Sequence, residues 1–366
     1  MPEAAGFVPR IAVAEVVAAW IAGTAPLAAR SLPLAEAAGA VAAEPVTAPG
    51  SLPASAIALI DGRAVMALET LGASPYAPAE LSRSLAVAAG DAVPPPFDAV
   101  AATDEGTATT ADVALGPGTA LRRSGADAGA GTVLIPAGTR LGARALAIAA
   151  AAGLGSLSVR QARVVLAADG GGDDPVIALV RGFLAARGVV TTVVALAEAG
   201  TASALEPDLM LLFGGAAIGA TDPALNAAVA APGWRAIGRP ALRPGETQIA
   251  GRIGGAPALV LPSRVDEALA AGLALIAPLL DARARAAPDP RATVRPLARK
   301  LVSAIGWTEL ALFAAVPDGG AWEPLGVGLL PAATLVRATH WSLLPPESEG
   351  HDAATPHAAD PWPDGL

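Results

Sequence analysis

The segment that decides the fold is RVVLAADGGGDDPVIALVRGFLAARGVVTTVVAL, residues Arg163–Leu196. Arg163–Ala168 has the continuous apolar pattern of a buried strand, and Val189–Leu196 repeats it after a helical stretch. Between them, Asp174 can accept hydrogen bonds from the free N–H groups of a helix start, and Pro175 suits the first helical position. This strand–helix–strand unit predicts a doubly wound α/β layer with a parallel sheet.

A third strand with a second glycine loop follows. Asp208–Phe213 has the same apolar pattern, Gly214 and Gly215 come directly after it, and Thr221-Asp222-Pro223 carries residues that begin a helix. In open α/β sheets the ligand crevice lies at the carboxyl ends of the strands, where glycines permit close approach and helix N-termini attract anions. The glycine loops after the first and third strands therefore indicate either an anion-binding edge or two ordinary tight turns.

The composition bounds the class of protein. The chain has 366 residues, of which 53% are hydrophobic and 16% charged, and this length predicts two to four domains. The longest apolar runs, such as Ala268–Leu280, are shorter than the roughly 20 residues that cross a bilayer, so we expect no membrane span and no membrane partner. Ile11–Trp20 has apolar residues at helical spacing around Glu15, which favours an amphipathic helix over an export signal and predicts a cytoplasmic location.

The rare side chains exclude several kinds of chemistry. The chain has no cysteine, which rules out disulfides, thiolate metal sites and thiol nucleophiles. Of its three histidines, His351 and His357 lie in an acidic C-terminal segment that we expect to be disordered. His340 alone remains as an ordered imidazole, so a zinc site and a Ser/His/Asp triad are disfavoured. The net charge of −9, with no cluster of Lys and Arg, argues against nucleic acid as a partner.

Several stretches of the chain carry a resemblance to a known family. Leu32–Val65 reads LPLAEAAGAVAAEPVTAPGSLPASAIALIDGRAV, Leu121–Asp127 reads LRRSGAD and is followed by GTVLIPAGTRLGARALAIAAAAGLGSLSV, and Gly214–Asp222 reads GGAAIGATD. Two shorter matches follow in order, Arg243-Pro244-Gly245 and Leu261-Pro262. Together these stretches resemble the motifs of the molybdopterin molybdenumtransferases, the family of MoeA and the gephyrin E domain.

The resemblance and the strand pattern together imply a multi-domain α/β plus β protein. Its centre is a doubly wound α/β domain of the molybdopterin-binding, MogA-like kind, with a small inserted β-rich domain and a C-terminal β domain. The expected parts are an N-terminal helix packing on the central domain (1–28), a linking domain (29–47 and 126–160), the inserted β-rich domain (48–125), the α/β domain (161–288), the C-terminal β domain (289–345) and a disordered acidic tail (346–366).

The resemblance also implies a chemistry. Family members bind molybdopterin or its adenylate between domains and insert molybdate with Mg²⁺-assisted cleavage of the adenylate. That chemistry needs carboxylates for a hard cation, basic groups for phosphates and glycines for close backbone approach. The resemblance implies Asp61, Asp127 and Asp222 as the catalytic carboxylates, with Asp61 aligned to the family's carboxylate implicated in catalysis and with Asp61 and Asp222 as metal ligands. The matching ligand-binding residues are Arg122, Arg123, Gly170, Gly171, Gly214, Gly215, Thr221, Arg243 and Gly245.

The chain departs from the family at ligand-binding positions. The aromatic residue of the family's M-D-G-Y-A-V element is Arg63, the second Lys of its K-P-G-K-P turn is Glu246, and the Asn of its L-P-G-N-P turn is Arg264. The threonine expected before Gly90 is Ala89, and the acidic pair after the first strand is replaced by glycines. Glu246 works against phosphate binding at this turn, because a carboxylate about 4 Å from a phosphate is repelled by about 4 kcal/mol at an effective dielectric near 20.

Three hypotheses about function stay open. The first is a divergent transferase of molybdenum-cofactor assembly that uses Mg²⁺, molybdopterin or its adenylate, and molybdate. The second is a catalytically degenerate relative that acts as a pterin-binding carrier or protein scaffold, with molybdoenzymes or other cofactor-assembly proteins as partners. The third is an α/β protein that binds another phosphorylated small molecule. The resemblance implies a homodimer in the first two cases.

Overall fold

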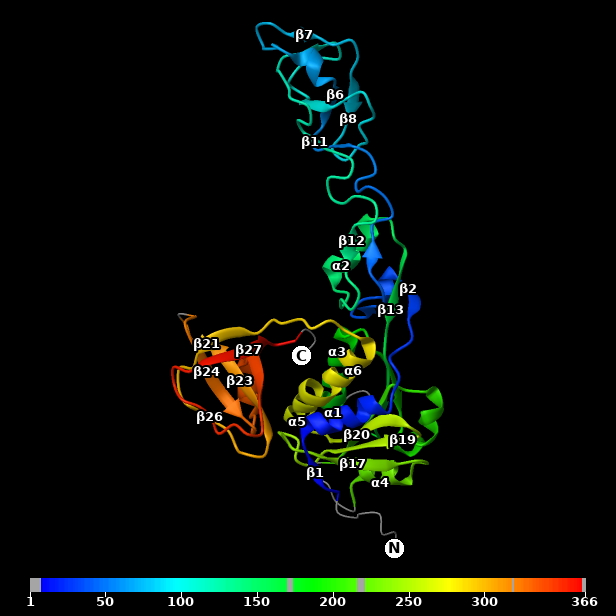
Figure 1. Cartoon of the computed structure of the whole chain (residues 1–366), viewed down its shortest axis with the longest axis vertical. Coiled ribbons are helices and arrows are strands. Elements are labelled where there is room, and N and C mark those ends of the chain that lie inside the picture. The colour runs from blue at the N-terminus through cyan, green and yellow to red at the C-terminus, as the bar shows by residue number, and fades with distance from the viewer. Residues whose placement is uncertain (1–7, 170–173, 216–220, 318, 364–366) are drawn as a thin grey trace. The chain divides into compact units, whose positions relative to one another are not determined.

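The computed structural model describes residues 8–169, 174–215, 221–317 and 319–363 (Figure 1). The chain divides into two compact units. The first unit comprises Met1–Glu44, Ala137–Leu146 and Ser156–Leu366, and the second comprises Pro45–Pro136 and Ala147–Gly155. The first unit contains the α/β layer and the C-terminal β sheet, and the second contains the inserted β-rich segment.

A seven-stranded sheet forms the centre of the first unit, in the order β1-β17-β19-β20-β16-β14-β15. Four neighbouring strands run parallel, and they include the three predicted from the sequence. They are β14 (Arg163–Ala167), β15 (Val190–Val194), β16 (Leu209–Gly214) and β20 (Ala256–Pro262). The other three are β1 (Arg10–Ile11), β17 (Arg235–Pro240) and β19 (Ile249–Ile253), of which β19 pairs antiparallel with both neighbours. The predicted fold class is confirmed.

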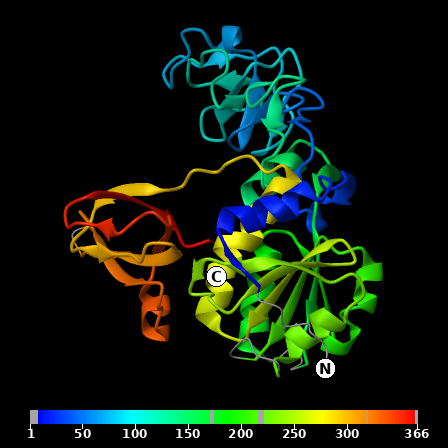
Figure 2. The ribbon, with the colours of Figure 1, turned by 60° about the horizontal axis from the view of Figure 1, so that its bottom comes forward.

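Helices cover both faces of this sheet, as Figure 2 shows. The helices are α1 (Val13–Ala22), α3 (Pro175–Ala186), α4 (Pro223–Ala230), α5 (Val265–Ala271) and α6 (Ala277–Ala284), with a π-helical turn at Gly272–Ile276 between the last two. Residues of α1, α3, α5 and α6 pack in one apolar cluster with Leu166 and Leu211, whereas α4 packs with Met210 and Leu212 on the other face. Shorter 3₁₀ turns occur at Leu34–Glu36, Ala67–Thr70, Leu196–Glu198 and Thr201–Leu205.

The helix starts follow the cap chemistry expected from the sequence. Asp174 accepts hydrogen bonds from the N–H groups of Val176 and Ile177 at the start of α3, and Pro175 occupies its first turn. The amphipathic helix expected at Ile11–Trp20 is α1, whose buried Trp20 donates its Nε1–H to the carbonyl of Gly251 at 2.9 Å.

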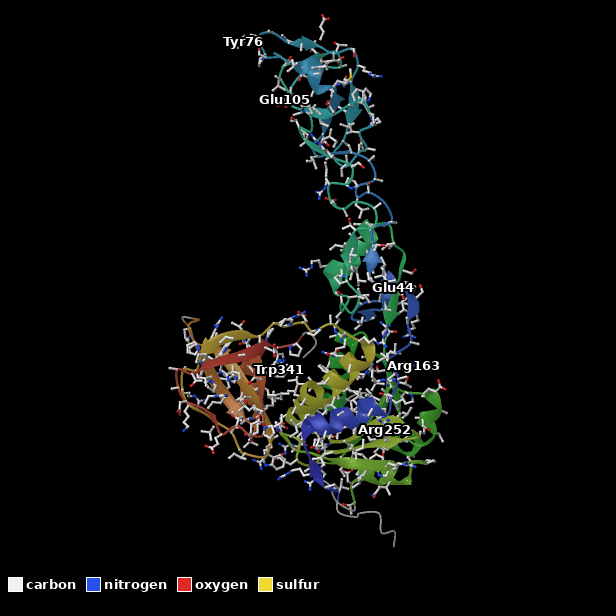
Figure 3. The ribbon with its side chains drawn as sticks, in the orientation of Figure 1. Glu44, Tyr76, Glu105, Arg163, Arg252 and Trp341 are labelled. Atoms are coloured by element: carbon white, nitrogen blue, oxygen red, sulfur yellow. The ribbon has the colours of Figure 1, made fainter. Side chains whose placement is uncertain are left out.

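The end of α1 is held from β19. Arg252, labelled in Figure 3, donates from Nη2 to the carbonyl oxygens of Ala19 at 2.8 Å and Trp20 at 2.7 Å. A cation at this position satisfies carbonyl groups that have no partner inside the helix and interacts favourably with its dipole. The N-terminal helix is thereby joined to the central sheet by polar bonds as well as by apolar packing.

The C-terminal part of the first unit is a second β sheet with the order β18-β23-β25-β27-β21, and β24 pairs with β23. The strands are β18 (Leu242–Arg243), β21 (Thr293–Pro296), β23 (Thr308–Ala315), β24 (Trp322–Val327), β25 (His340–Leu344) and β27 (Pro356–Pro361). The pair β22 (Leu301–Val302) and β26 (Gly350–His351) and the helix α7 (Ala332–Arg337) complete it. Its core contains Phe313 and Trp322, both fully buried.

The expectation of a disordered tail after residue 345 is wrong for the described part of that segment. β26 pairs with β22, and β27 pairs antiparallel with both β21 and β25. The acidic composition is misleading because the alternation of β27 matters more than net charge here. His357 and Ala359 are buried, whereas their neighbours Pro356 and Ala358 are exposed. Backbone pairing on both sides then orders a segment that has few apolar residues.

The second unit is built from short strands. Its three-stranded sheet has β6 (Gly62–Val65) between β8 (Leu85–Val87) and β9 (Ala99–Ala102). The unit also has three antiparallel pairs: β4 (Val46–Thr47) with β12 (Val133–Ile135), β5 (Ile57–Ala58) with β11 (Leu121–Arg122), and β7 (Ala79–Glu80) with β10 (Thr110–Ala111). The helix α2 (Ala143–Ala151) follows. Another small sheet, of β2 (Arg30–Pro33), β3 (Val41–Ala42) and β13 (Ser156–Arg160), belongs to the first unit.

Within the described residues, none of the helices is both long and apolar enough to cross a membrane.

We expect acidification to destabilise the C-terminal sheet through His357. Burial is the main reason that the pKa of His357 is lowered, and the neighbouring His351 adds to the effect. The folded protein therefore binds this proton less readily than the unfolded chain, in which His titrates near ~6.5. The free energy of unfolding should fall as the pH drops from about 6.5 towards the folded pKa, and it should be constant above that window.

The measurement is urea unfolding at a series of pH values between about 8 and about 5, on the wild type and on His357→Gln. The variant should show a shallower dependence of stability on pH than the wild type. Equal dependence in the two proteins would contradict the expectation.

Candidate functional site

The carboxyl ends of β14, β16 and β20 meet at one edge of the central sheet because these strands are neighbours and parallel. The loop after β14 contains Gly170 and Gly171, two predicted ligand-binding residues that lie outside the described residues. The loops after β16 and β20 are joined by the Ser263 hydroxyl, which donates to the carbonyl of Gly214 at 2.8 Å. The predicted glycine loop after β16 therefore lies at the edge where the sequence places the ligand crevice.

Asp222 is the N-cap of α4 and is almost fully buried. Its Oδ1 accepts the N–H of Leu225 at 2.8 Å, and its Oδ2 accepts the N–H of Gly215 at 2.9 Å. A Cβ on Gly214 would stand 2.6 Å from Oδ1, so only glycine lets the carboxylate approach the strand end this closely. Thr221, just before the cap, is exposed. Asp222 thus shapes the glycine loop, and each of its carboxylate oxygens already accepts one backbone N–H.

Arg243 lies at the end of β18 and is held on several sides. Its Nε is 3.1 Å from Oε1 of Glu246, and its Nη1 is 3.9 Å from Oε1 of the buried Glu309. The guanidinium also stacks on the ring of Trp307 at 4.2 Å, and that ring carries Arg10 as a second cation at 4.3 Å. The positive charge that the resemblance assigns to a phosphate is therefore largely balanced by two carboxylates of the same chain.

Gly245 has a positive φ of 135°, and a Cβ there would stand 2.8 Å from Nε2 of Gln248. Gln248 is fully buried and donates from Nε2 to the carbonyl of Glu267 at 3.0 Å. Its Oε1 has no hydrogen-bond partner among the described residues. The turn from Arg243 to Gln248 is thus packed against the start of α5 by polar contacts that require glycine at position 245.

Two of the departures from the family motifs, Glu246 and Arg264, belong to one charged network. Arg264 is bound to Asp266 at 2.9 Å and lies 3.5 Å from the buried Glu267. Burial raises the pKa of Glu267 above its ordinary value, and Arg264 opposes that rise. The negative charge of Glu246 raises the pKa of Glu267 and that of Arg264 as well. The carboxylate gained at 246 and the guanidinium gained at 264 therefore act on the same buried group.

Sequence reasoning missed the buried acids of this network. Glu267 follows Asp266 at the start of an otherwise apolar helix, and Glu309 interrupts the apolar strand β23. The Oε2 atom of Glu309 accepts from the Ser303 hydroxyl at 2.9 Å and from the N–H of Ala304 at 2.8 Å. A single carboxylate inside an apolar run is the signal that marks such residues, because its burial is costly without partners.

The second unit holds the other predicted charged residues, in two separate places. Arg122 and Asp127 bind each other, with Arg122 Nε donating to Asp127 Oδ1 at 2.7 Å, and both side chains are well exposed. Arg123 donates to the carbonyl of Pro117 at 3.0 Å. Asp61 stands at the start of β6, where its Oδ1 accepts the N–H of Ala89 at 2.8 Å and its side chain lines a cavity of about 490 Å³.

The predicted metal ligands do not form a group within either unit. Asp61 belongs to the second unit and Asp222 to the first. Over the part of the chain that the structure describes, no three His, Asp or Glu side chains are grouped as a metal site. Each oxygen of Asp222 already accepts one backbone N–H, so a Mg²⁺ ion would share the carboxylate with both of these contacts. We therefore derive no step through a metal.

The comparison with known proteins agrees with the resemblance seen in the sequence. Residues 11–153 match the family model of the MoeA N-terminal region (domain I and II). The fold is similar to that of a molybdopterin biosynthesis MoeA protein from Pyrococcus horikoshii OT3, with a TM-score of 0.66 and 16% identity over 96% of this chain and 100% of that one. A molybdenum cofactor biosynthesis protein from Pyrococcus furiosus gives 0.58 and 14% over 96% and 100%. No curated protein matches the chain.

We expect the positive charge of Arg264 to stabilise the buried carboxylate of Glu267, because Arg264 opposes the rise of its pKa. Arg264→Asn should lower the free energy of unfolding by about 2 kcal/mol at neutral pH, because Asp266 and Glu267 lose their cation. Adding Glu267→Gln should restore part of the loss. Urea unfolding checks both, with Arg337→Ala as the control, since Arg337 pairs with Glu323 at the exposed surface and should change stability by less than about 0.5 kcal/mol. Equal losses in Arg264→Asn and Arg337→Ala would contradict this role.

Proposed function

Because the chain resembles the MoeA family and shares the MoeA fold along its length, we propose that it works in molybdenum-cofactor biosynthesis by binding a molybdopterin-type compound. The observation that carries this proposal is the family match over residues 11–153 together with a fold similarity that covers 96% of the chain. The cavity at Asp61 supplies a place for a ligand, and Gly214 and Gly215 lie at the sheet edge where open α/β sheets bind theirs.

Within that pathway we favour a role in holding or carrying the pterin compound without cleaving its adenylate. Three charged groups that the cleavage chemistry would use already have partners in this chain. Asp222 caps α4, Arg243 is balanced by Glu246 and Glu309, and Asp127 is paired with Arg122. Releasing any of these groups towards a ligand would break a contact of the folded protein, and at Asp222 or Glu309 it would leave a buried partner unpaired.

A transferase remains the second candidate, and Asp61 favours it. Its carboxylate lines the cavity of the second unit, its Oδ1 accepts one backbone N–H, and it has no ion pair among the described residues. Asp61 is also the residue that aligns with the family's catalytic carboxylate. An active enzyme would therefore depend on Asp61 more than on Asp127 or Asp222.

AMP release distinguishes the two roles. Purified protein is mixed with adenylylated molybdopterin, Mg²⁺ and molybdate, beside a control without protein and the Asp61→Ala variant. We expect the protein to retain the pterin compound on gel filtration while AMP appears no faster than in the control. AMP release that Asp61→Ala abolishes would overturn the carrier role and establish the transferase. Failure to retain the pterin compound would remove the proposed function altogether.

A further inference from the structure

The cavity of the second unit has a size and a lining suited to a small ring-shaped ligand. Its volume of about 490 Å³ falls within the range of roughly 300–1,000 Å³ of small-molecule sites. Small residues form most of its wall, namely Gly62, Ala86, Val87, Ala88, Gly106 and Ala108. Two charged side chains, Asp61 and Arg63, line it together with Thr103 and Thr107. The cavity therefore combines a flat apolar wall with one carboxylate and one guanidinium.

Arg63 is positioned by a chain of hydrogen bonds that leaves its outer nitrogens available. Its Nε donates to the Ser84 hydroxyl at 2.9 Å, and that hydroxyl donates to the carbonyl of Ala108 at 2.6 Å. Across the described residues, neither Nη1 nor Nη2 has a hydrogen bond or an ion pair. The guanidinium is thus held on one side and open on the other, an arrangement that reduces the entropy lost when it binds a ligand.

Asp61 immediately precedes β6 and Arg63 lies within it, and both residues line the cavity. Two positions this close along the chain are at most about 7 Å apart, and the two side chains form no ion pair within the described structure. Gly62 between them brings β6 against β9, since a Cβ there would stand only 1.9 Å from the carbonyl oxygen of Ala101. The carboxylate and the guanidinium therefore face the cavity as two separate groups.

We propose that this cavity binds the 2-amino-4-oxo ring edge found in pterins and in guanine. A carboxylate accepts two adjacent N–H groups, which the 2-amino group and the neighbouring ring N–H provide. A guanidinium donates to two adjacent acceptors, which the 4-oxo group and the next ring nitrogen provide, as arginine does with O6 and N7 of guanine. An edge with its donors at one end and its acceptors at the other can therefore use Asp61 and Arg63 together.

The charges around the cavity favour such a ring over a bare phosphate. Asp61 contributes a negative charge to the lining, and Glu105, labelled in Figure 3, lies in the loop that follows β9 and accepts the N–H of Ala102 at 2.9 Å. A phosphate beside Arg63 would be repelled by Asp61, whereas a neutral ring can use both groups. Arg63 thus becomes a specificity residue, at the position where the family has an aromatic side chain.

This inference rests on the proposed function for the choice of a pterin, and the experiment separates the two. The full chain is titrated with 6-hydroxymethylpterin, and binding is followed by fluorescence. Lumazine tests the 2-amino group, which it lacks. Guanosine and inosine repeat this test for purines, because inosine lacks the 2-amino group of guanosine. Variants are Asp61→Asn and Arg63→Ala. The controls are Asp91→Asn, whose Oδ2 supports the same loop through Ala88 N at 2.8 Å, and Arg83→Ala, an exposed arginine of the same unit that does not line the cavity.

We expect 6-hydroxymethylpterin to bind the wild type, Asp91→Asn and Arg83→Ala alike, and to bind Asp61→Asn and Arg63→Ala at least about tenfold more weakly. Lumazine should bind the wild type weakly. Pterin binding that both cavity variants retain would overturn this site and leave the proposed function standing. Binding of guanosine but not of the pterin, lost in both variants, would support the ring-edge site and overturn the choice of a pterin as its ligand. No binding of any of the four compounds would overturn the ring-edge site, and retention of the pterin compound on gel filtration then decides the proposed function separately.

Discussion

The structure depends on the burial of β16 on both faces. Leu209, Met210, Leu211 and Leu212 are completely buried, with β14 and β20 hydrogen-bonded on either side. A strand with no solvent face requires a helix layer above and below the sheet, and α3, α5 and α4 fill those layers. Parallel pairing then brings the ends of β14, β16 and β20 to one edge, so the position of the glycine loops follows from the apolar strand.

Charged residues gather where the turn after β18 meets the start of α5, which follows β20. The start of α5 and the turn at Arg243–Gln248 meet through the buried Gln248 and its bond to the Glu267 carbonyl. Carboxylates buried at this junction need cations, and Arg243 and Arg264 provide them. A junction whose charges are balanced in this way stabilises the protein, and it offers less attraction to a phosphate than an open cluster of lysines would.

Local signals in the sequence were sufficient for the central layer. Asp174-Pro175 and Asp222-Pro223 predict helix starts because cap and first-turn preferences act within a few residues, and the apolar runs predict the parallel strands for the same reason. The pairing of Glu246 with Arg243 and its influence on Arg264 were not predictable, since they depend on side chains brought together by the fold. The ordering of β27 was missed because an acidic composition hides the alternation of His357 and Ala359.

For the candidate site residues, too, the sequence located the groups but did not predict their tertiary contacts. The position of Asp222 beside Gly214 and Gly215 was predicted, but the contacts show that its carboxylate is occupied by the loop and helix that it joins. Asp61 was identified through the resemblance, whereas the cavity it shares with Arg63 depends on Ser84 and Ala108 from other segments. Residue type and order thus located the carboxylates, and tertiary contacts decide which of them can still bind a ligand.

The shared network of Glu246 and Arg264 has a consequence for the history of the sequence. A lineage that acquired Glu246 before Arg264 would have placed a second carboxylate near the buried Glu267 with no cation at position 264 to offset it, whereas Arg264 alone would have stabilised Glu267. The cost of Glu246 therefore depends on the residue at position 264, and the less costly order of substitution places Arg264 first.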